Sequence, residues 1–159
     1  TNYGSTFTAS NQSLDFVWTC VAMSASGQYQ TAVSGTDTAT RDSNIYYSTD
    51  YGVTWTASTQ FQTSKIGWTF VAMSSSGQYQ TAVAGTTASF LGNAGNIYYS
   101  TNYGVTWIPC IQNFSNSWFS VGMSSSGQYQ LASIGGRASY VSSTYVVVVT
   151  SAVPVIVHK

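Results

Sequence analysis

One segment of 18 residues occurs three times in this chain at a constant spacing. The copies are WTCVAMSASGQYQTAVSG at 18–35, WTFVAMSSSGQYQTAVAG at 68–85 and WFSVGMSSSGQYQLASIG at 118–135. Met23, Met73 and Met123 hold the same place in each copy, so the period is 50 residues. A repeat of this length, with no helical periodicity inside it, predicts three equivalent units built from the same few strands.

Each unit is expected to contain four strands. In the second copy these are 68–73, 78–84, 97–100 and 105–107, with the glycine turn SSSG between the first two. Apolar side chains point to both sides of the first strand, which indicates a sheet that is covered on both faces. The predicted fold is all-β: tandem four-stranded antiparallel blades of about 50 residues, β-propeller-like, with three blades that are incomplete or completed by assembly.

The chain of 159 residues is expected to form a single β-repeat domain. We divide it into a leading strand at 1–10, blade 1 at 11–57, blade 2 at 58–109, and blade 3 with a valine-rich tail at 110–159. The last two strands of blade 3 are expected within 140–149, where Thr144 and Val146 replace the acidic residue and the glycine of the earlier turns. The run 145–157 is too short for a membrane helix, so no membrane insertion is expected.

The turn before the fourth strand reads STDYGVTW at 48–55 and STNYGVTW at 100–107, and TNYGSTF opens the chain. Asp50 can accept hydrogen bonds from the backbone of the turn, and Gly52 can adopt a positive φ. Asn102 replaces Asp50 in the second copy, and an amide could not replace a catalytic acid. We therefore assign a structural role to the conserved positions of both copies: Ser48, Asp50, Gly52, Thr54 and Trp55, and Ser100, Asn102, Gly104, Thr106 and Trp107.

These two segments resemble the Asp-box, or BNR, repeat of sialidase-like β-propellers. The resemblance implies a propeller fold with the box on the outer side of each blade, remote from any active site. Sialidases of this kind use three arginines, a Tyr/Glu pair and an acidic residue, whereas this chain has two arginines and no glutamate. We therefore expect a non-catalytic member and no enzyme activity, with a sialidase-like glycoside hydrolase fragment as the least favoured alternative.

Other chemistry has weak support in the sequence. Charged residues make up 5% of the chain and the net charge is zero, which argues against nucleic-acid binding. His158 is the only histidine, and Asp37 and Asp42 match no calcium loop, so neither a metal site nor a cofactor is expected. Cys20 and Cys110 hold non-equivalent repeat positions, and we expect two unpaired thiols while leaving a disulfide open.

The candidate binding residues are the tyrosines at the tips of the turns, which could stack on sugars or pack on a partner: Tyr3, Tyr51, Tyr103 and Tyr145. The alternative is that each ring packs on its own blade. Asn11 and Asn113 lie in N-x-S triplets and are candidate glycosylation sites.

Two function classes remain open at this point. The first is recognition or adhesion, with glycans as candidate ligands, at an extracellular, cell or virion surface. The second is a structural subunit of a filament, coat or virion surface that self-associates into a ring or filament through exchange of terminal strands. A composition poor in charge but rich in Ser, Thr, Asn, Gln and Tyr is typical of such surface proteins.

Overall fold

The structure is a computed structural model, and it describes residues 4–7, 9–10, 16–35, 43–58, 66–85, 95–110, 117–134 and 146–150. The secondary structure of these segments is entirely strand and turn. None of the described segments contains a helix long and apolar enough to cross a membrane.

The first two repeats each form a four-stranded antiparallel sheet in which neighbours along the chain are neighbours in the sheet. The first sheet contains β1 (Val17–Met23), β2 (Gln30–Gly35), β3 (Ile45–Ser48) and β4 (Thr56–Ala57). The second contains β5 (Gly67–Met73), β6 (Gln80–Gly85), β7 (Ile97–Ser100) and β8 (Ile108–Pro109). Four antiparallel strands per unit were predicted, and these two sheets confirm it.

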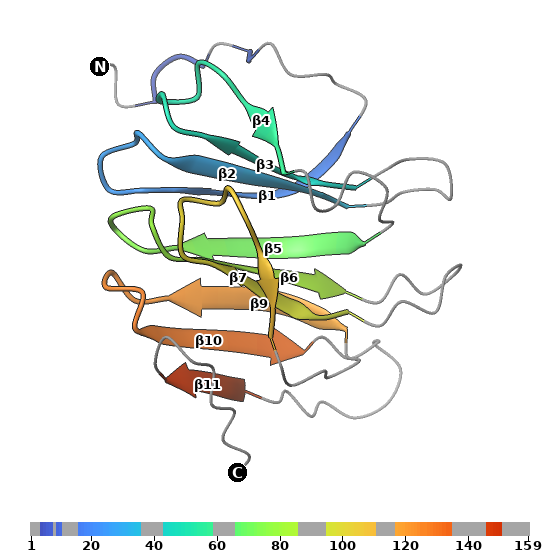
Figure 1. The fold of residues 1–159 in the computed structure, drawn as a ribbon. Coiled ribbons are helices and arrows are strands. Elements are labelled where there is room, and N and C mark those ends of the chain that lie inside the picture. Colours follow the sequence, from blue (N-terminus) through green and yellow to red (C-terminus); the bar gives the residue numbers. More distant parts are fainter. Residues whose placement is uncertain are drawn as a thin grey trace.

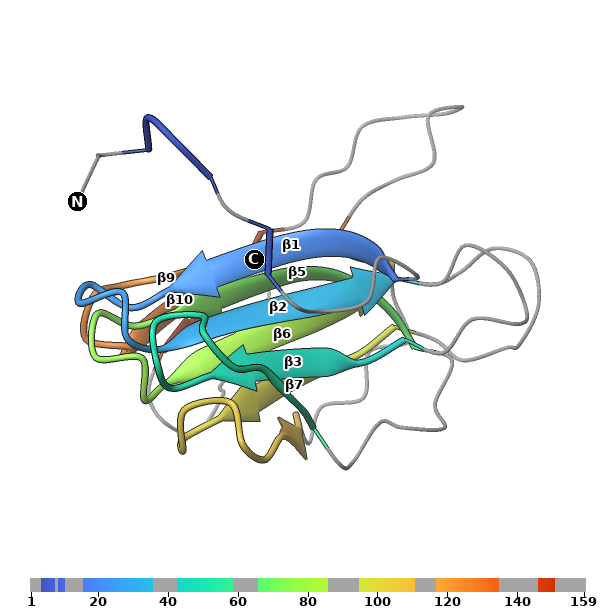
Figure 2. The ribbon, with the colours of Figure 1, turned by 90° about the horizontal axis from the view of Figure 1, so that it is seen from above.

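The third repeat contributes three described strands in the order β11-β10-β9: β9 (Trp118–Met123), β10 (Tyr129–Ile134) and β11 (Val146–Thr150). The three sheets lie one above another, with the chain beginning at one end of the stack and finishing at the other (Figure 1). β1 packs beside β5, and β5 packs beside β9. Seen from above, the strands of successive sheets run nearly over one another (Figure 2).

Two short strands lie later in the chain than expected. The fourth strand was predicted at 53–55 and 105–107, but β4 and β8 begin at Thr56 and Ile108. The side chain of Asp50 holds the backbone N–H of Thr54 inside the turn, so pairing with β3 starts only after Trp55.

The prediction for the end of the third blade was wrong. Gln130 pairs with Val149, just as Gln30 pairs with Ser48 in the first sheet. β11 is therefore the third strand of its sheet, whereas residues 147–149 had been expected to form the fourth. A run of valines suits a strand in either place, and only pairing with β10 sets the register.

A bulge explains why the alternation of apolar residues in the first strand is imperfect. The register shifts between Trp18 and Cys20, and again between Trp68 and Phe70. The extra residue directs Thr19 and Cys20 toward the same neighbouring sheet. There Thr19 Oγ1 donates a hydrogen bond to the Trp68 carbonyl at 2.9 Å, and Cys20 Sγ lies 3.7 Å from the Val71 carbonyl.

The hydrophobic core lies between the sheets. One cluster of buried side chains fills the space between the first and second sheets: Val33, Ile45, Trp68, Val71, Ala82, Ala84 and Trp107. The other lies between the second and third sheets: Val83, Ile97, Cys110, Trp118, Val121 and Ala132. Each sheet thus depends on a neighbour to remove its apolar side chains from water.

Candidate functional site

The first turn is held by hydrogen bonds of four side chains. Ser48 Oγ accepts from the backbone N–H of Gly52 at 2.9 Å and donates to Asp50 Oδ1 at 2.8 Å. Asp50 Oδ1 also accepts from the Thr54 N–H at 2.9 Å, while its Oδ2 accepts from the Thr54 hydroxyl. Trp55 Nε1 donates to the Gly52 carbonyl at 3.1 Å. Both carboxylate oxygens of Asp50 therefore accept hydrogen bonds from within the turn itself.

The second turn repeats the arrangement with an amide. Asn102 Oδ1 accepts from the Thr106 N–H at 3.0 Å, and its Nδ2 donates to the Thr106 hydroxyl at 2.8 Å. Ser100 Oγ accepts from the Gly104 N–H at 3.0 Å, and Trp107 Nε1 donates to the Gly104 carbonyl at 2.9 Å. The exchange of Asp for Asn therefore reverses only one hydrogen bond: Asp50 accepts from the threonine hydroxyl, whereas Asn102 donates to it.

The Asp50 carboxylate is unsuited to acid catalysis at neutral pH. Hydrogen bonds from the Thr54 hydroxyl, the Thr54 backbone and the Ser48 hydroxyl hold the pKa of Asp50 below its usual value. A general acid at neutral pH needs a raised pKa instead.

The candidate tyrosines lie in different environments. Tyr51 and Tyr103 both have positive φ, 64° and 63°, in a region that side chains other than Gly, Asn and Asp seldom adopt. The Tyr103 ring stacks on Tyr29 of the preceding sheet, with centroids 4.3 Å apart and planes inclined by 30°. Tyr51 occupies the same place in the first sheet and is exposed. Tyr3 and Tyr145 lie outside the described residues.

The positive φ of the two tyrosines had no signal in the sequence. Gly52 and Gly104, with φ of 81° and 82°, directly follow them, so two consecutive residues are left-handed in each turn. The hydrogen bonds of these turns keep Tyr51 and Tyr103 in this unfavourable conformation.

Equivalent residues are buried inside the stack and exposed at its first sheet. Val71 and Val121 are 2% and 5% exposed because each lies against the preceding sheet, while Val21 is 70% exposed. Met23 is likewise exposed and Trp18 partly so. We call this outer surface of the first sheet the leading face, defined by Trp18, Val21 and Met23.

The outer surface of the third sheet differs chemically from the inner ones. Thr19 and Thr69 donate to the Trp68 and Trp118 carbonyls of the next sheet, both at 2.9 Å. The third repeat has Phe119 at this place, and it is exposed.

A second threonine is lost at the same surface. Thr31 Oγ1 donates to Gln80 Oε1 at 2.7 Å, and Thr81 donates to Gln130 in the same way. The third repeat has Leu131 there, exposed like its neighbour Tyr129. We call the surface formed by Phe119, Tyr129 and Leu131 the trailing face. The sequence carried a signal for the trailing face, because Phe119 and Leu131 depart from the other two copies, but none for the leading face, whose three residues are the same in every copy.

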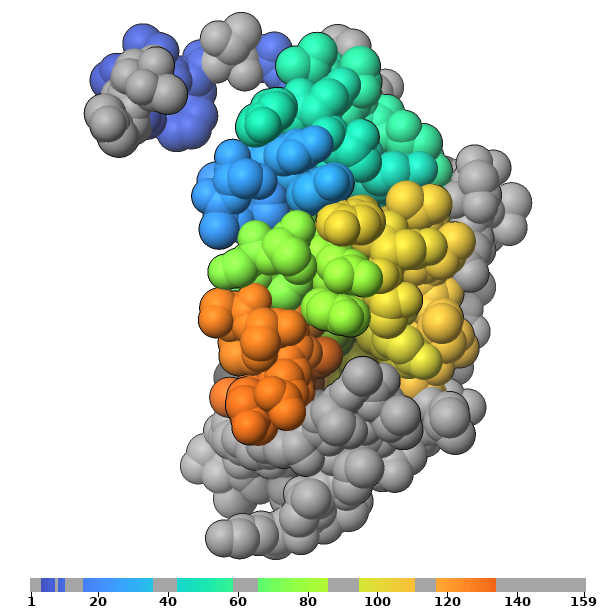
Figure 3. Space-filling model, turned by 60° about the vertical axis from the view of Figure 1, so that its left-hand side comes forward, coloured from blue at the N-terminus to red at the C-terminus, as the bar shows by residue number. Residues whose placement is uncertain are grey.

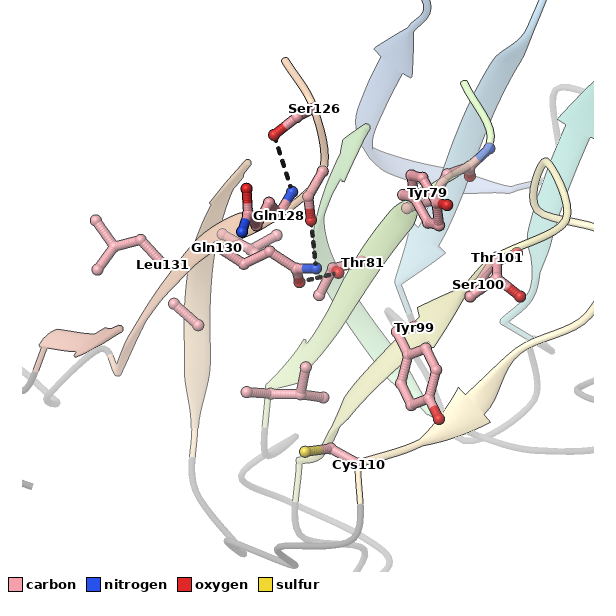
Figure 4. A pocket seen from close by; sticks show the side chains of 15 residues that line it. Tyr79, Thr81, Tyr99, Ser100, Thr101, Cys110, Ser126, Gln128, Gln130 and Leu131 are labelled. Atoms are coloured by element: carbon pink, nitrogen blue, oxygen red, sulfur yellow. Dashed lines mark hydrogen bonds between the residues drawn. The ribbon is translucent and has the colours of Figure 1, made fainter. Parts of the chain in front are cut away.

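A cavity of about 290 Å³ lies between the second and third sheets. Tyr99 and Cys110 line one side, and Gln130 lines the other, as Figure 4 shows. Thr81 and Gln130 are joined by their hydrogen bond at the boundary between the sheets.

The candidate glycosylation sites Asn11 and Asn113 lie outside the described residues, as do Asp37, Asp42 and His158, at which no site was expected. No group of three or more potential metal ligands occurs in the described part of the chain. Cys20 and Cys110 are both free thiols, as expected.

No protein-family model matches the chain, and no curated protein matches it. Solved structures do. The chain aligns with the GH74 enzyme of Niastella koreensis at a TM-score of 0.65 and 15% identity, over 88% of this chain and 22% of that one. It aligns with a putative TolB from Agrobacterium tumefaciens at a TM-score of 0.62 and 13% identity, over 92% and 49%. Both are β-propellers.

The fold is that of an open run of β-propeller blades. A third match, YCF48 bound to a D1 peptide, has a TM-score of 0.52 and 18% identity, over 86% of this chain and 42% of that one. The chain therefore spans less than half the length of these structures. At such identities the likeness shows the fold alone, and the three sheets, from here on called blades, are not closed into a ring.

Proposed function

We propose that this chain is a non-catalytic propeller module that works by assembly: the trailing face of one copy packs on the leading face of another. The observation that carries the proposal is the contrast between Val21, exposed at the leading face, and Val71 and Val121, buried at the same position inside the stack. The equivalent face of the other two blades is a buried interface, and an apolar face left exposed in this way favours association.

The two faces fit each other by the pattern of the inner interfaces. Tyr29 stacks on Tyr103 of the following blade, so Tyr129 of one copy would stack on Tyr51 of the next. Both rings are exposed in the single chain. Phe119 and Leu131 replace threonines, which makes the trailing face more apolar than an inner one and suits it to burial between copies.

Head-to-tail packing of unlike faces gives a ring or a filament, which is the second of the two function classes that the sequence left open. We also infer that the Ser48–Trp55 and Ser100–Trp107 turns are Asp-boxes of the BNR type. The hydrogen bonds of Asp50 and Asn102 support this assignment. An extracellular or particle-surface location is part of the proposal and rests on composition.

Glycan or surface recognition is the second candidate. Tyr51 favours it, because its ring is exposed at a turn tip. Tyr103 supports it less, since one side of its ring is occupied by Tyr29. A glycan array would test it, with binding expected to be lost on Tyr51→Ala.

The assembly proposal is tested by placing a charge on the leading face. Val21 and Val53 are 70% and 69% exposed, but Val53 lies on a turn and outside both faces. Sedimentation velocity of the full chain should show association that rises with concentration. Val21→Asp should abolish it, and Val53→Asp should leave it unchanged. A wild-type chain that stays monomeric at every concentration would refute the proposal.

A further inference from the structure

Residues 1–10 repeat the turn and last strand of a blade. They read TNYGSTFTAS, against TDYGVTWTAS at 49–58, with seven of ten positions identical. Phe7 takes the place of the box tryptophan. It precedes Trp18 by 11 residues, the same spacing that separates Trp107 from Trp118.

The described part of this segment has the backbone angle of the box glycine but not the burial of the box tryptophan. Gly4 has a φ of 86°, close to the values at Gly52 and Gly104. Phe7 is 93% exposed, whereas Trp107 is 1% exposed. Figure 3 shows the segment, in dark blue, projecting beyond the first blade. A left-handed glycine thus lies three residues before an aromatic ring that is open to solvent.

The cavity between the second and third blades occupies the place of a missing ring. Trp107 lies between the first and second blades, in the cluster that contains Ile45, Val71 and Ala82. The equivalent residues at the next interface line the cavity: Ile97, Val121 and Ala132. The register of β11 assigns residues 149–156 to the box positions of the third repeat, and these read VTSAVPVI. They include no Trp, Asp, Asn or Gly.

We infer that this cavity binds Phe7 of a second copy, so that the segment around Phe7 of one chain supplies the missing turn for the third blade of another. The inference rests on the proposed assembly and names the site through which it occurs. In both described connections, a box and its strand directly precede the first strand of the next blade. The segment around Phe7 precedes β1, so it belongs with a blade located before β1.

The third blade of the same chain does not satisfy that requirement. It lies at the far end of an open stack, with the first and second blades between it and the N-terminal segment (Figure 1). When the trailing face of one copy packs on the leading face of another, that third blade comes directly before β1. The same head-to-tail packing would thus cover both exposed faces and bring Phe7 to the cavity.

The chemistry of the cavity suits a phenyl ring. Its volume of about 290 Å³ exceeds the ~150 Å³ that suffices for benzene in an apolar cavity. Ile97, Val121 and Ala132 supply aliphatic contacts. Tyr79 also lines it and holds the place of Tyr29, whose ring stacks on Tyr103 at the preceding interface.

The test compares self-association of the full chain with that of Phe7 variants by sedimentation velocity over a wide concentration range. Phe7→Ala should weaken association by about ten- to a hundredfold, the effect of losing one buried phenyl ring. Phe7→Trp should match or exceed the wild type, because it restores the residue of the other boxes. Val105→Ala, at an outward position of the second box, is the matched control and should have no effect.

A crosslink locates the site. In a Cys20→Ala background, Phe7→Cys should be joined to Cys110 of another copy by a short bismaleimide, giving a dimer on a denaturing gel. Val53→Cys should not form it. Association that survives Phe7→Ala unchanged, without the crosslink, would overturn this inference and leave assembly through the faces standing. A wild-type monomer, or a crosslink within one chain, would overturn it as well, and the wild-type monomer would overturn the assembly proposal too.

Discussion

At the scale of single residues, neighbouring blades decide how strictly glycine is required. Gly27 and Gly77 hold the same place in the first two repeats, with φ of 79° and 81°. A Cβ on Gly77 would lie 2.7 Å from Tyr29 Cβ, while a Cβ on Gly27 would meet nothing closer than 3.7 Å. The same turn is therefore constrained by its own backbone in both copies, and by packing in only one.

We expect Gly77→Ala to destabilise the chain much more than Gly27→Ala. The positive φ costs about 1 kcal/mol at either site. At Gly77 the contact with Tyr29 adds a clash that only a shift of a whole blade could relieve, so the loss should be at least about twice as large. Urea unfolding of the two variants measures the difference. Equal losses would mean that the first two blades do not pack as described.

Asp50 should make stability dependent on acid pH. Its pKa is lowered in the folded chain by Thr54 and Ser48, so its contribution is present above the unfolded value of ~3.9 and is lost as pH falls through the folded pKa. The difference in melting temperature between wild type and Asp50→Asn should therefore change as the pH falls from about 5 to about 2. Asn102→Asp should introduce a similar dependence at the second turn. A constant difference across this range would contradict the assignment.

At the scale of strands and sheets, hydroxyl-to-amide hydrogen bonds connect one blade to the next. Thr31 donates to Gln80, which is buried, and Thr81 donates to Gln130, which is only partly buried. A buried acceptor that loses its donor cannot turn to water for another.

Thr31→Val should therefore cost more stability than Thr81→Val. Valine keeps the shape of threonine and removes only the hydroxyl. We expect a loss of about 1–3 kcal/mol at Thr31 and about half of that at Thr81, measured by urea unfolding. Similar losses at both sites would show that Gln80 finds a replacement partner.

At the scale of the whole molecule, both outer faces are apolar and nearly without charge. Asp50 is the only charged side chain within the described residues, and it bonds within its own turn. Association through these faces depends on burial of apolar surface, which salt screening does not weaken.

The association constant should accordingly stay constant, or rise slightly, as sodium chloride increases from about 0.01 M to 1 M, across which the screening length shrinks from about 30 Å to 3 Å. Sedimentation velocity at fixed protein concentration measures this. Replacing chloride by sulfate should strengthen association. A marked decrease with salt would point to charged residues outside the two faces.

The sequence alone determined the local features of this protein. The 50-residue period, the strand-turn-strand order of each unit and the polar side chains of the turns follow from residue types a few positions apart, so they could be predicted without a structure. Asn102 in place of Asp50 was sufficient to indicate a structural turn.

Only the tertiary structure decided what each repeat copy does. Val21, Val71 and Val121 are the same residue in the same strand position, yet only the first is exposed, because no blade covers it in this chain. Tyr103 stacks on Tyr29, while the equivalent Tyr51 is exposed. The pairing of Val146–Thr150 with β10 makes this segment the third strand of its blade and not the fourth. Burial depends on contacts between residues some 50 positions apart, and the register of β11 depends on its pairing with β10. A repeated sequence gives every copy the same letters whether or not a neighbour is present.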